Sequence, residues 1–208
     1  MTAHPATVFV VDDDAAVRRS LHELMVSASL PVESFETSQS FLDALDPGRP
    51  GCILLDLRLR EGSGLDLQDE LRRRKISLPI IVLTGHGDVP SSVRSLKAGA
   101  FDFLQKPTPP AVLLERVRAA LECDRAEREH RSSRTAGLDR LASLTPRERE
   151  VMTMLVAGAT SKEVAYDLKI SPRTVEVHRA NIMSKMQARN LPELVRMTIA
   201  MGFPEKRG

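Results

Sequence analysis

The chain has 208 residues, too many for one small domain, and its composition (42% apolar, 28% charged, 3% aromatic) is that of a globular protein with aliphatic cores. No signal peptide, membrane span or thiol metal site is expected, because the sequence lacks a basic and apolar leader and a long apolar run, and Cys52 and Cys123 lie far apart. Residues 1–124 hold 14 basic and 18 acidic side chains whereas residues 139–208 hold 12 and 8, which suggests cation or phosphoryl chemistry in the first half and a nucleic-acid surface in the second.

The first half alternates short apolar runs with amphipathic stretches. The apolar runs, which predict strands, are 8–11, 32–35, 52–55, 80–83 and 101–104. The amphipathic stretches, which predict helices, are 15–28, 38–45, 65–74, 89–97 and 111–123. Regular alternation of this kind predicts an α/β domain, a doubly wound five-stranded parallel sheet with helices on both faces, over residues 1–124. In such sheets ligands bind at the carboxyl ends of the strands.

The middle of the chain is strongly polar. Apolar residues nearly vanish from residue 124 to residue 134, so we expect residues 125–140 to be a solvated helical extension that runs into a linker, which ends near Gly137.

A small all-α domain of four helices is expected over residues 141–208. Thr145, Pro146 and Glu148 form a helix-start signal, with a capping residue, a proline in the first turn and a glutamate three residues after the cap. The helical patterns run to about residue 156 and then over about 161–168, 171–186 and 191–201.

Chemically suitable side chains gather where the strands of the first half end. These residues are Asp12, Asp13, Asp14, Asp56, Thr84 and Lys106. Several carboxylates in one crevice would repel one another unless a hard cation lay among them, and all-oxygen ligands favour Mg²⁺. An aspartate beside Mg²⁺, a hydroxyl and an ammonium can attack a phosphoryl group. A lone aspartate after a strand is more often a helix cap, so the prediction depends on the whole set.

Residues 6–122 resemble the CheY-like, flavodoxin-like receiver family. The matching motifs are the acidic pair Asp12 and Asp13, the phosphoacceptor Asp56 in LLDLRL, the hydroxyl residue Thr84, the Lys106 of QKP and the aromatic switch residue Phe103. The resemblance implies that Mg²⁺ is bound by Asp13, Asp56 and the backbone carbonyl of Arg58, with Asp12 acting largely through water. It also implies a cis peptide bond before Pro107.

The match departs from the family at Arg60, where receivers usually have a proline; the loss of that fixed φ is expected to loosen the loop. Two alternatives remain open. A receiver that never accepts phosphate could merely hold the second domain. A phosphohydrolase of the haloacid-dehalogenase type could use Asp12 and Asp14, although Ala16 stands where that motif has a threonine.

Residues 141–203 resemble the LuxR/FixJ-type helix-turn-helix, a long and specific signature. Ser171 and Pro172 are expected to start the recognition helix, with Val175, Ile182 and Met186 facing inward. The candidates for DNA contact are Lys162, Arg173, Thr174, Glu176, Val177, Arg179 and Lys185. Of these, Glu176 is expected to read cytosine and Val177 a thymine methyl, whereas Lys162, Thr174, Arg179 and Lys185 are candidates for phosphate contact. The alternative is a generic helical bundle.

Together the resemblances imply a FixJ-like two-component response regulator, a cytoplasmic transcription factor and not an enzyme. A sensor histidine kinase would phosphorylate Asp56 with the help of Mg²⁺, Thr84 would move toward the phosphate, and Phe103 would rotate inward. The face altered by these movements is expected to hold Val89, Val93, Leu96 and Asp102. Homodimerisation through that face, or release of the helical domain from the receiver, would let two recognition helices bind neighbouring half-sites of promoter DNA. There the protein is expected to activate transcription through RNA polymerase.

Overall fold

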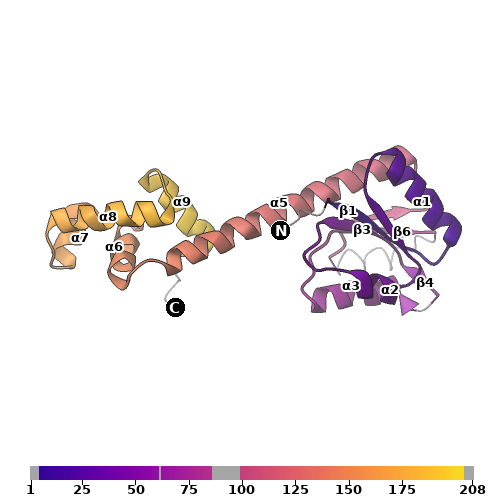
Figure 1. Cartoon of the computed structure of the whole chain (residues 1–208), viewed down its shortest axis with the longest axis horizontal. Helices are drawn as coiled ribbons and strands as arrows, with labels where there is room; N and C mark the ends of the chain where they lie inside the picture. The colour runs from indigo at the N-terminus through magenta and orange to yellow at the C-terminus, as the bar shows by residue number, and fades with distance from the viewer. Residues whose placement is uncertain (1–4, 61, 86–98, 204–208) are drawn as a thin grey trace. The chain divides into compact units, whose positions relative to one another are not determined.

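The computed structural model describes residues 5–60, 62–85 and 99–203, which form two compact units, Met1–Arg128 and Glu129–Gly208 (Figure 1). None of the described helices has the length and apolar content that crossing a membrane requires.

The first unit is built on a five-stranded sheet. Its strands are β1 (Thr7–Val11), β2 (Val32–Phe35), β3 (Gly51–Asp56), β6 (Ile80–Thr84) and β7 (Asp102–Gln105). Their order is β2-β1-β3-β6-β7, and every neighbouring pair is parallel. The five predicted strands and the parallel sheet are therefore confirmed.

Helices cover both faces of this sheet. Alternate residues of a strand point to opposite faces, so Phe9 and Val11 of β1 pack in one hydrophobic cluster while Val8 and Val10 pack in another. The first cluster includes residues of α2 (Ser38–Ala44) and α3 (Gly64–Arg73), and the second includes residues of α1 (Ala15–Ser27) and α5 (Pro110–Ala142). This is the doubly wound arrangement that the alternating pattern predicted.

Two elements differ from the expectation. The loop after Asp56 was expected to be loosened, but it contains a short antiparallel pair, β4 (Arg58–Leu59) and β5 (Gly62–Ser63). Strands of two residues are too short to show a periodic pattern. The predicted helix 89–97, with Val89, Val93 and Leu96, lies outside the described residues.

Helix α5 is the other difference, since it continues without a break to Ala142, through the whole stretch expected to become a linker. After Leu121, the last α5 residue that packs against the second cluster, the helix is held by Asp124. Asp124 is 2% exposed and accepts hydrogen bonds from the Gly51 amide (2.9 Å) and from Arg128 Nε (2.7 Å). Arg128 also donates to the carbonyls of Gly48 and Arg49, at 2.9 and 2.6 Å. Gly137 does not end the helix.

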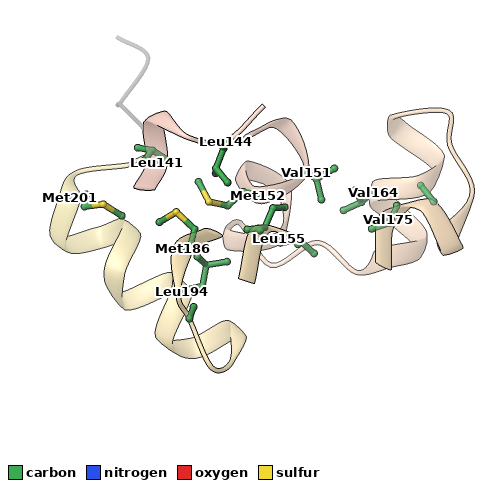
Figure 2. Packing of buried hydrophobic residues seen from close by; sticks show 13 residues of the cluster. Leu141, Leu144, Val151, Met152, Leu155, Val164, Val175, Met186, Leu194 and Met201 are labelled. Atoms are coloured by element: carbon green, nitrogen blue, oxygen red, sulfur yellow. The ribbon is translucent and has the colours of Figure 1, made fainter. Parts of the chain in front are cut away.

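The second unit contains α6 (Pro146–Val156), α7 (Ser161–Asp167), α8 (Pro172–Met186) and α9 (Leu191–Met201), as predicted. Each helix begins at a capping side chain that accepts a hydrogen bond from the helical backbone, namely Thr145, Thr160, Ser171 and Asn190. The core of the second unit is aliphatic and rich in methionine. Figure 2 shows members of that core, among them Met152, Leu155, Met186 and Leu194.

Candidate functional site

Lys106 joins two carboxylates at the carboxyl end of the sheet. Its Nζ lies 2.5 Å from Asp12 Oδ2 and 2.7 Å from Asp56 Oδ2, although the residues are 94 and 50 positions apart in the chain. Burial alone would lower the pKa of Lys106, but the hydrogen bonds to Asp12 and Asp56 outweigh burial and raise the pKa above its ordinary value. The side chain therefore remains a cation at any physiological pH.

Asp56 ends β3 and presents a carboxylate that is well supplied with donors. Its Oδ1 accepts from the amide of Arg58 (2.9 Å), its Oδ2 accepts from Lys106, and its side chain is 13% exposed. Thr84 ends the neighbouring strand β6, is 1% exposed, and its carbonyl accepts from the amide of Lys106 at 2.8 Å. The peptide bond between Lys106 and Pro107 is cis, as the resemblance implied.

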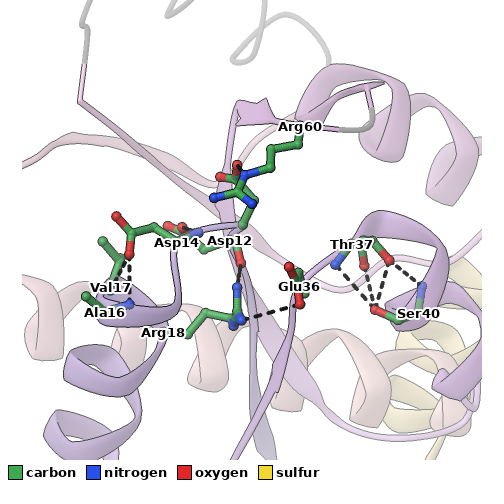
Figure 3. A network of polar contacts seen from close by, with 10 residues as sticks. Asp12, Asp14, Ala16, Val17, Arg18, Glu36, Thr37, Ser40 and Arg60 are labelled. Carbon is green, nitrogen blue, oxygen red and sulfur yellow. Dashed lines mark hydrogen bonds and ion pairs between the residues drawn. The ribbon is translucent and has the colours of Figure 1, made fainter.

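The three consecutive aspartates after β1 have three different roles, and Figure 3 shows two of them, Asp12 and Asp14. Asp12 is 2% exposed and binds Lys106, while its Oδ1 also accepts from the amide of Asp14. Asp14 caps α1 by accepting from the amides of Ala16 and Val17, and these hydrogen bonds lower the pKa of its carboxyl. Asp13 remains, and its Oδ2 lies 3.1 Å from Nε of Arg60.

Two arginines at this site were missed as functional candidates. Arg18 donates to the carbonyl of Asp12 (2.7 Å) and pairs with Glu36 (3.7 Å), so it holds the loop in which Asp12 lies. The other is Arg60, which was expected only to loosen the loop by replacing a proline. Neither contact of Arg18 is with the helix cap four residues before it, so the spacing along α1 did not signal the role of Arg18. Nothing in the local sequence signalled the pairing of Arg60 with Asp13.

Phe103 lies on β7, next to the strand that ends in Thr84. It is half-buried and packs against the cluster that α2 and α3 cover. Its neighbour Asp102 forms an ion pair with Arg116 of α5 at 3.3 Å.

The second site is the outer surface of α8. Ser171 caps this helix by accepting from the amide of Thr174 at 3.0 Å, and Val175, Ile182 and Met186 are fully buried, as predicted. The opposite side presents exposed side chains, including Val177 at 55%. Helices α7 and α8, with the short turn between them, thus have the arrangement of a helix-turn-helix.

The predicted DNA contacts on this surface do not share one environment. Lys162, Arg173 and Thr174 are exposed. Glu176 is exposed too, but its Oε1 accepts a hydrogen bond from the hydroxyl of Ser161 at the start of α7 (2.7 Å) and lies 4.0 Å from Arg179. The carboxylate of Glu176 is thus held between the two helices.

Lys185 lies in a different setting. Its Nζ is 2.6 Å from Oε2 of Glu148 and 3.4 Å from the carbonyl of Ser143. Glu148 is only 4% exposed, and the hydrogen bond from Lys185, followed by the one from the amide of Thr145, lowers the pKa of its carboxyl. The structure therefore gives Lys185 a partner within the unit, joining α8 to the start of α6.

Comparison with known proteins identifies both domains. The model of the response regulator receiver domain matches residues 8–118, and the model of the luxR family of bacterial regulatory proteins matches residues 142–198. The transcriptional regulatory protein FixJ of Azorhizobium caulinodans is 48% identical over 195 residues, which cover 94% of this chain and 92% of that protein. FixJ of Rhizobium meliloti is 44% identical and covers 95% of this chain and 97% of its own.

Solved structures give the same picture. The response regulator StyR is similar with a TM-score of 0.84 and 39% identity, covering 94% of this chain and 98% of its own. Full-length FixJ from B. japonicum has a TM-score of 0.60 and 42% identity, covering 96% of this chain and 98% of its own. The chain therefore belongs to the response regulators that join a receiver domain to a luxR-family DNA-binding domain, and it is a two-component response regulator that acts as a transcription factor, not an enzyme.

Proposed function

We propose that a sensor histidine kinase transfers a phosphoryl group to Asp56 and that this modification controls binding of promoter DNA by α8. The observation that carries the proposal is the contact between Lys106 and Asp56, 2.7 Å, in a cluster that also contains the buried Asp12. A kinase-bound phosphohistidine would supply the phosphoryl group. The new O–P bond forms at Asp56 as the N–P bond breaks, and the departing imidazole takes up a proton.

Lys106 and Thr84 would act on the charge that this transfer brings. The ammonium of Lys106 already contacts Asp56 and can neutralise the phosphoryl oxygens, and Thr84 ends the adjacent strand. Loss of the Asp56–Lys106 contact in favour of the phosphoryl group would change the ends of β6 and β7, where Phe103 lies. We propose that these changes promote homodimerisation through the face that includes Asp102.

Magnesium is the cofactor that the donor set fits. Asp13 and Asp56 offer carboxylate oxygens, Arg58 offers a backbone carbonyl, and Asp12 lies next to them, all donors that a hard cation prefers. Within the described residues, no three acidic, histidine or cysteine side chains already form a metal cluster. By the resemblance to receiver domains, the residues that would hold Mg²⁺ are Asp13, Asp56 and the Arg58 carbonyl, with Asp12 through water. Bound Mg²⁺ would supply positive charge that neutralises the phosphoryl oxygens.

For DNA, we propose that α8 enters the major groove. The exposed Lys162, Arg173 and Thr174 and the half-buried Arg179 would hold phosphates, while Glu176 and Val177 would read base edges. The hydrogen bond from Ser161 supports a fixed position for the Glu176 carboxylate. Lys185 stays a prediction as a phosphate ligand, and its pairing with Glu148 favours a structural role. On promoter DNA we expect the protein to activate transcription through RNA polymerase, in the cytoplasm where that DNA lies.

The decisive test is phosphate-affinity electrophoresis after incubation with acetyl phosphate and Mg²⁺. We expect a shifted band for the wild type, none for Asp56→Asn and a much weaker one for Asp12→Asn. An unshifted wild type would favour a receiver that never accepts phosphate. A label that persists in Asp56→Asn but needs Asp12 would point instead to phosphohydrolase-like chemistry.

A further inference from the structure

An arginine, Arg60, occupies the outer edge of the phosphorylation site. It directly follows β4, and its Nε lies 3.1 Å from Oδ2 of Asp13. Asp13 is 21% exposed at its side chain, whereas Arg60 is 76% exposed. Among the described contacts, Lys106 binds Asp12 and the α1 backbone binds Asp14. The guanidinium of Arg60 reaches from solvent to Asp13, the aspartate between them.

The backbone keeps Arg60 within reach of Asp13. Arg58 and Leu59 pair with Ser63 and Gly62, and the amide of Gly64 donates to the carbonyl of Leu57 at 3.0 Å. This closure is tight, because a Cβ on Gly64 would lie 2.5 Å from the carbonyl oxygen of Asp56. The loop is thus fastened to the end of β3, while the side chain of Arg60 is 76% exposed and can turn toward solvent.

Two cationic side chains of the protein neutralise the carboxylates at the site. Lys106 is shared by Asp12 and Asp56, and Arg60 pairs with Asp13. A divalent cation that binds Asp13 must take the carboxylate from Arg60, and the guanidinium must then move away from a like charge. An exposed ion pair of this kind contributes little to the free energy of unfolding. Its main effect is therefore on the affinity of Asp13 for a competing cation.

We propose that Arg60 is an internal counterion that competes with Mg²⁺ for Asp13, so that it weakens Mg²⁺ binding and sets the metal concentration at which the receiver becomes competent for phosphorylation. This inference rests on the proposed function, which places Mg²⁺ on Asp13. Arg60 is a positioning and tuning residue in this account, since it touches a ligand of the metal and none of the reacting atoms.

The test is Mg²⁺ titration of the full-length protein by isothermal calorimetry at low ionic strength. Replacement of Arg60 by glutamine is expected to lower the Kd for Mg²⁺ by about threefold to tenfold. The advantage should shrink as salt is raised, because exposed charges are screened. The matched control is Arg72→Gln, which removes an equal charge from another exposed pair, Arg72 with Asp69 on α3. Circular dichroism of each variant checks that the fold is intact.

Each outcome has one meaning. A lower Kd for Arg60→Gln with an unchanged Kd for Arg72→Gln supports the inference. Equal Kd values in wild type and Arg60→Gln, or an equal gain in Arg72→Gln, overturn it and leave the proposed phosphorylation of Asp56 intact. If neither the wild type nor Arg60→Gln binds Mg²⁺, the magnesium-dependent function itself is overturned, and the inference with it.

Discussion

The ion pair between Lys185 and Glu148 shows how burial changes the value of a charge. Glu148 accepts from Lys185 and from the amide of Thr145, so one buried carboxylate both caps α6 and fastens α8 to it. A carboxylate that is 4% exposed cannot recover its hydration if one partner is removed. Lys185 therefore contributes more to the free energy of unfolding than an exposed lysine would.

Replacement of Lys185 by methionine is therefore expected to destabilise the second unit by about 1–3 kcal/mol, because it leaves the charge of Glu148 buried with fewer partners. Urea unfolding followed by circular dichroism measures the change. The exposed Lys162 is the control, and its replacement by methionine should alter stability by less than about 0.5 kcal/mol. Equal stability of the two variants would show that the Lys185 pair contributes nothing.

The same pair predicts a pH dependence. The folded protein lowers the pKa of Glu148 below its ordinary value of 4.5, so folding favours the ionised carboxylate. The stabilisation is fully present above pH 4.5 and is lost as pH falls through the folded pKa. We expect the difference in unfolding free energy between wild type and Lys185→Met to be constant from pH 6 to 8 and to shrink below about 4.5. A difference that grows on acidification would contradict the assignment.

At the scale of elements, α5 holds together where its sequence offers almost no apolar side chains. Pairs three and four residues apart stabilise it, such as Arg125 with Glu122 and Arg128 with Asp124. The second pair is also bound to the rest of the first unit, through Gly48, Arg49 and Gly51. We infer that Asp124 and Arg128 mark the last point along α5 at which the first unit holds the helix in place.

Replacement of Arg128 by glutamine should loosen the helix beyond that point. It removes the hydrogen bonds to two carbonyls and leaves the buried Asp124 with one donor fewer, so amide hydrogen exchange over residues 125–142 is expected to rise by roughly tenfold. Arg125→Gln is the matched control, since it breaks an exposed pair on the same helix, and it should change exchange by less than about twofold. If both variants exchange alike, the anchor does not hold the helix.

What could be predicted at this scale depends on how local the signal is. The five strands and the helices of the second unit follow from periodic apolar patterns and from caps such as Thr145 and Ser171, which lie within a few residues of what they determine. The pair β4–β5 and the continuation of α5 rest on contacts with the end of β3 and with the loop before it. The roles of Lys185 and Arg60 also depend on distant contacts, because their partners are 37 and 47 residues away in the chain.

At the scale of the molecule, the two units communicate through the dimer that we propose to form on phosphorylation. A dimer would present two copies of α8 to neighbouring half-sites, and the second copy would then bind at the high local concentration fixed by the first. Phosphorylation would therefore raise DNA affinity without any change within α8 itself.

Sedimentation equilibrium with and without beryllofluoride, a phosphoryl mimic, tests this coupling. We expect the mass of the wild type to approach that of a dimer with the mimic and that of Asp56→Asn to remain monomeric, because the mimic binds at that carboxylate. Affinity for operator DNA, measured by fluorescence anisotropy at fixed salt, should rise by at least about tenfold in parallel, and only in the wild type. If the DNA affinity rises while the mass stays monomeric, phosphorylation acts by freeing α8 from the receiver rather than by pairing two chains, and the dimer has no part in the mechanism.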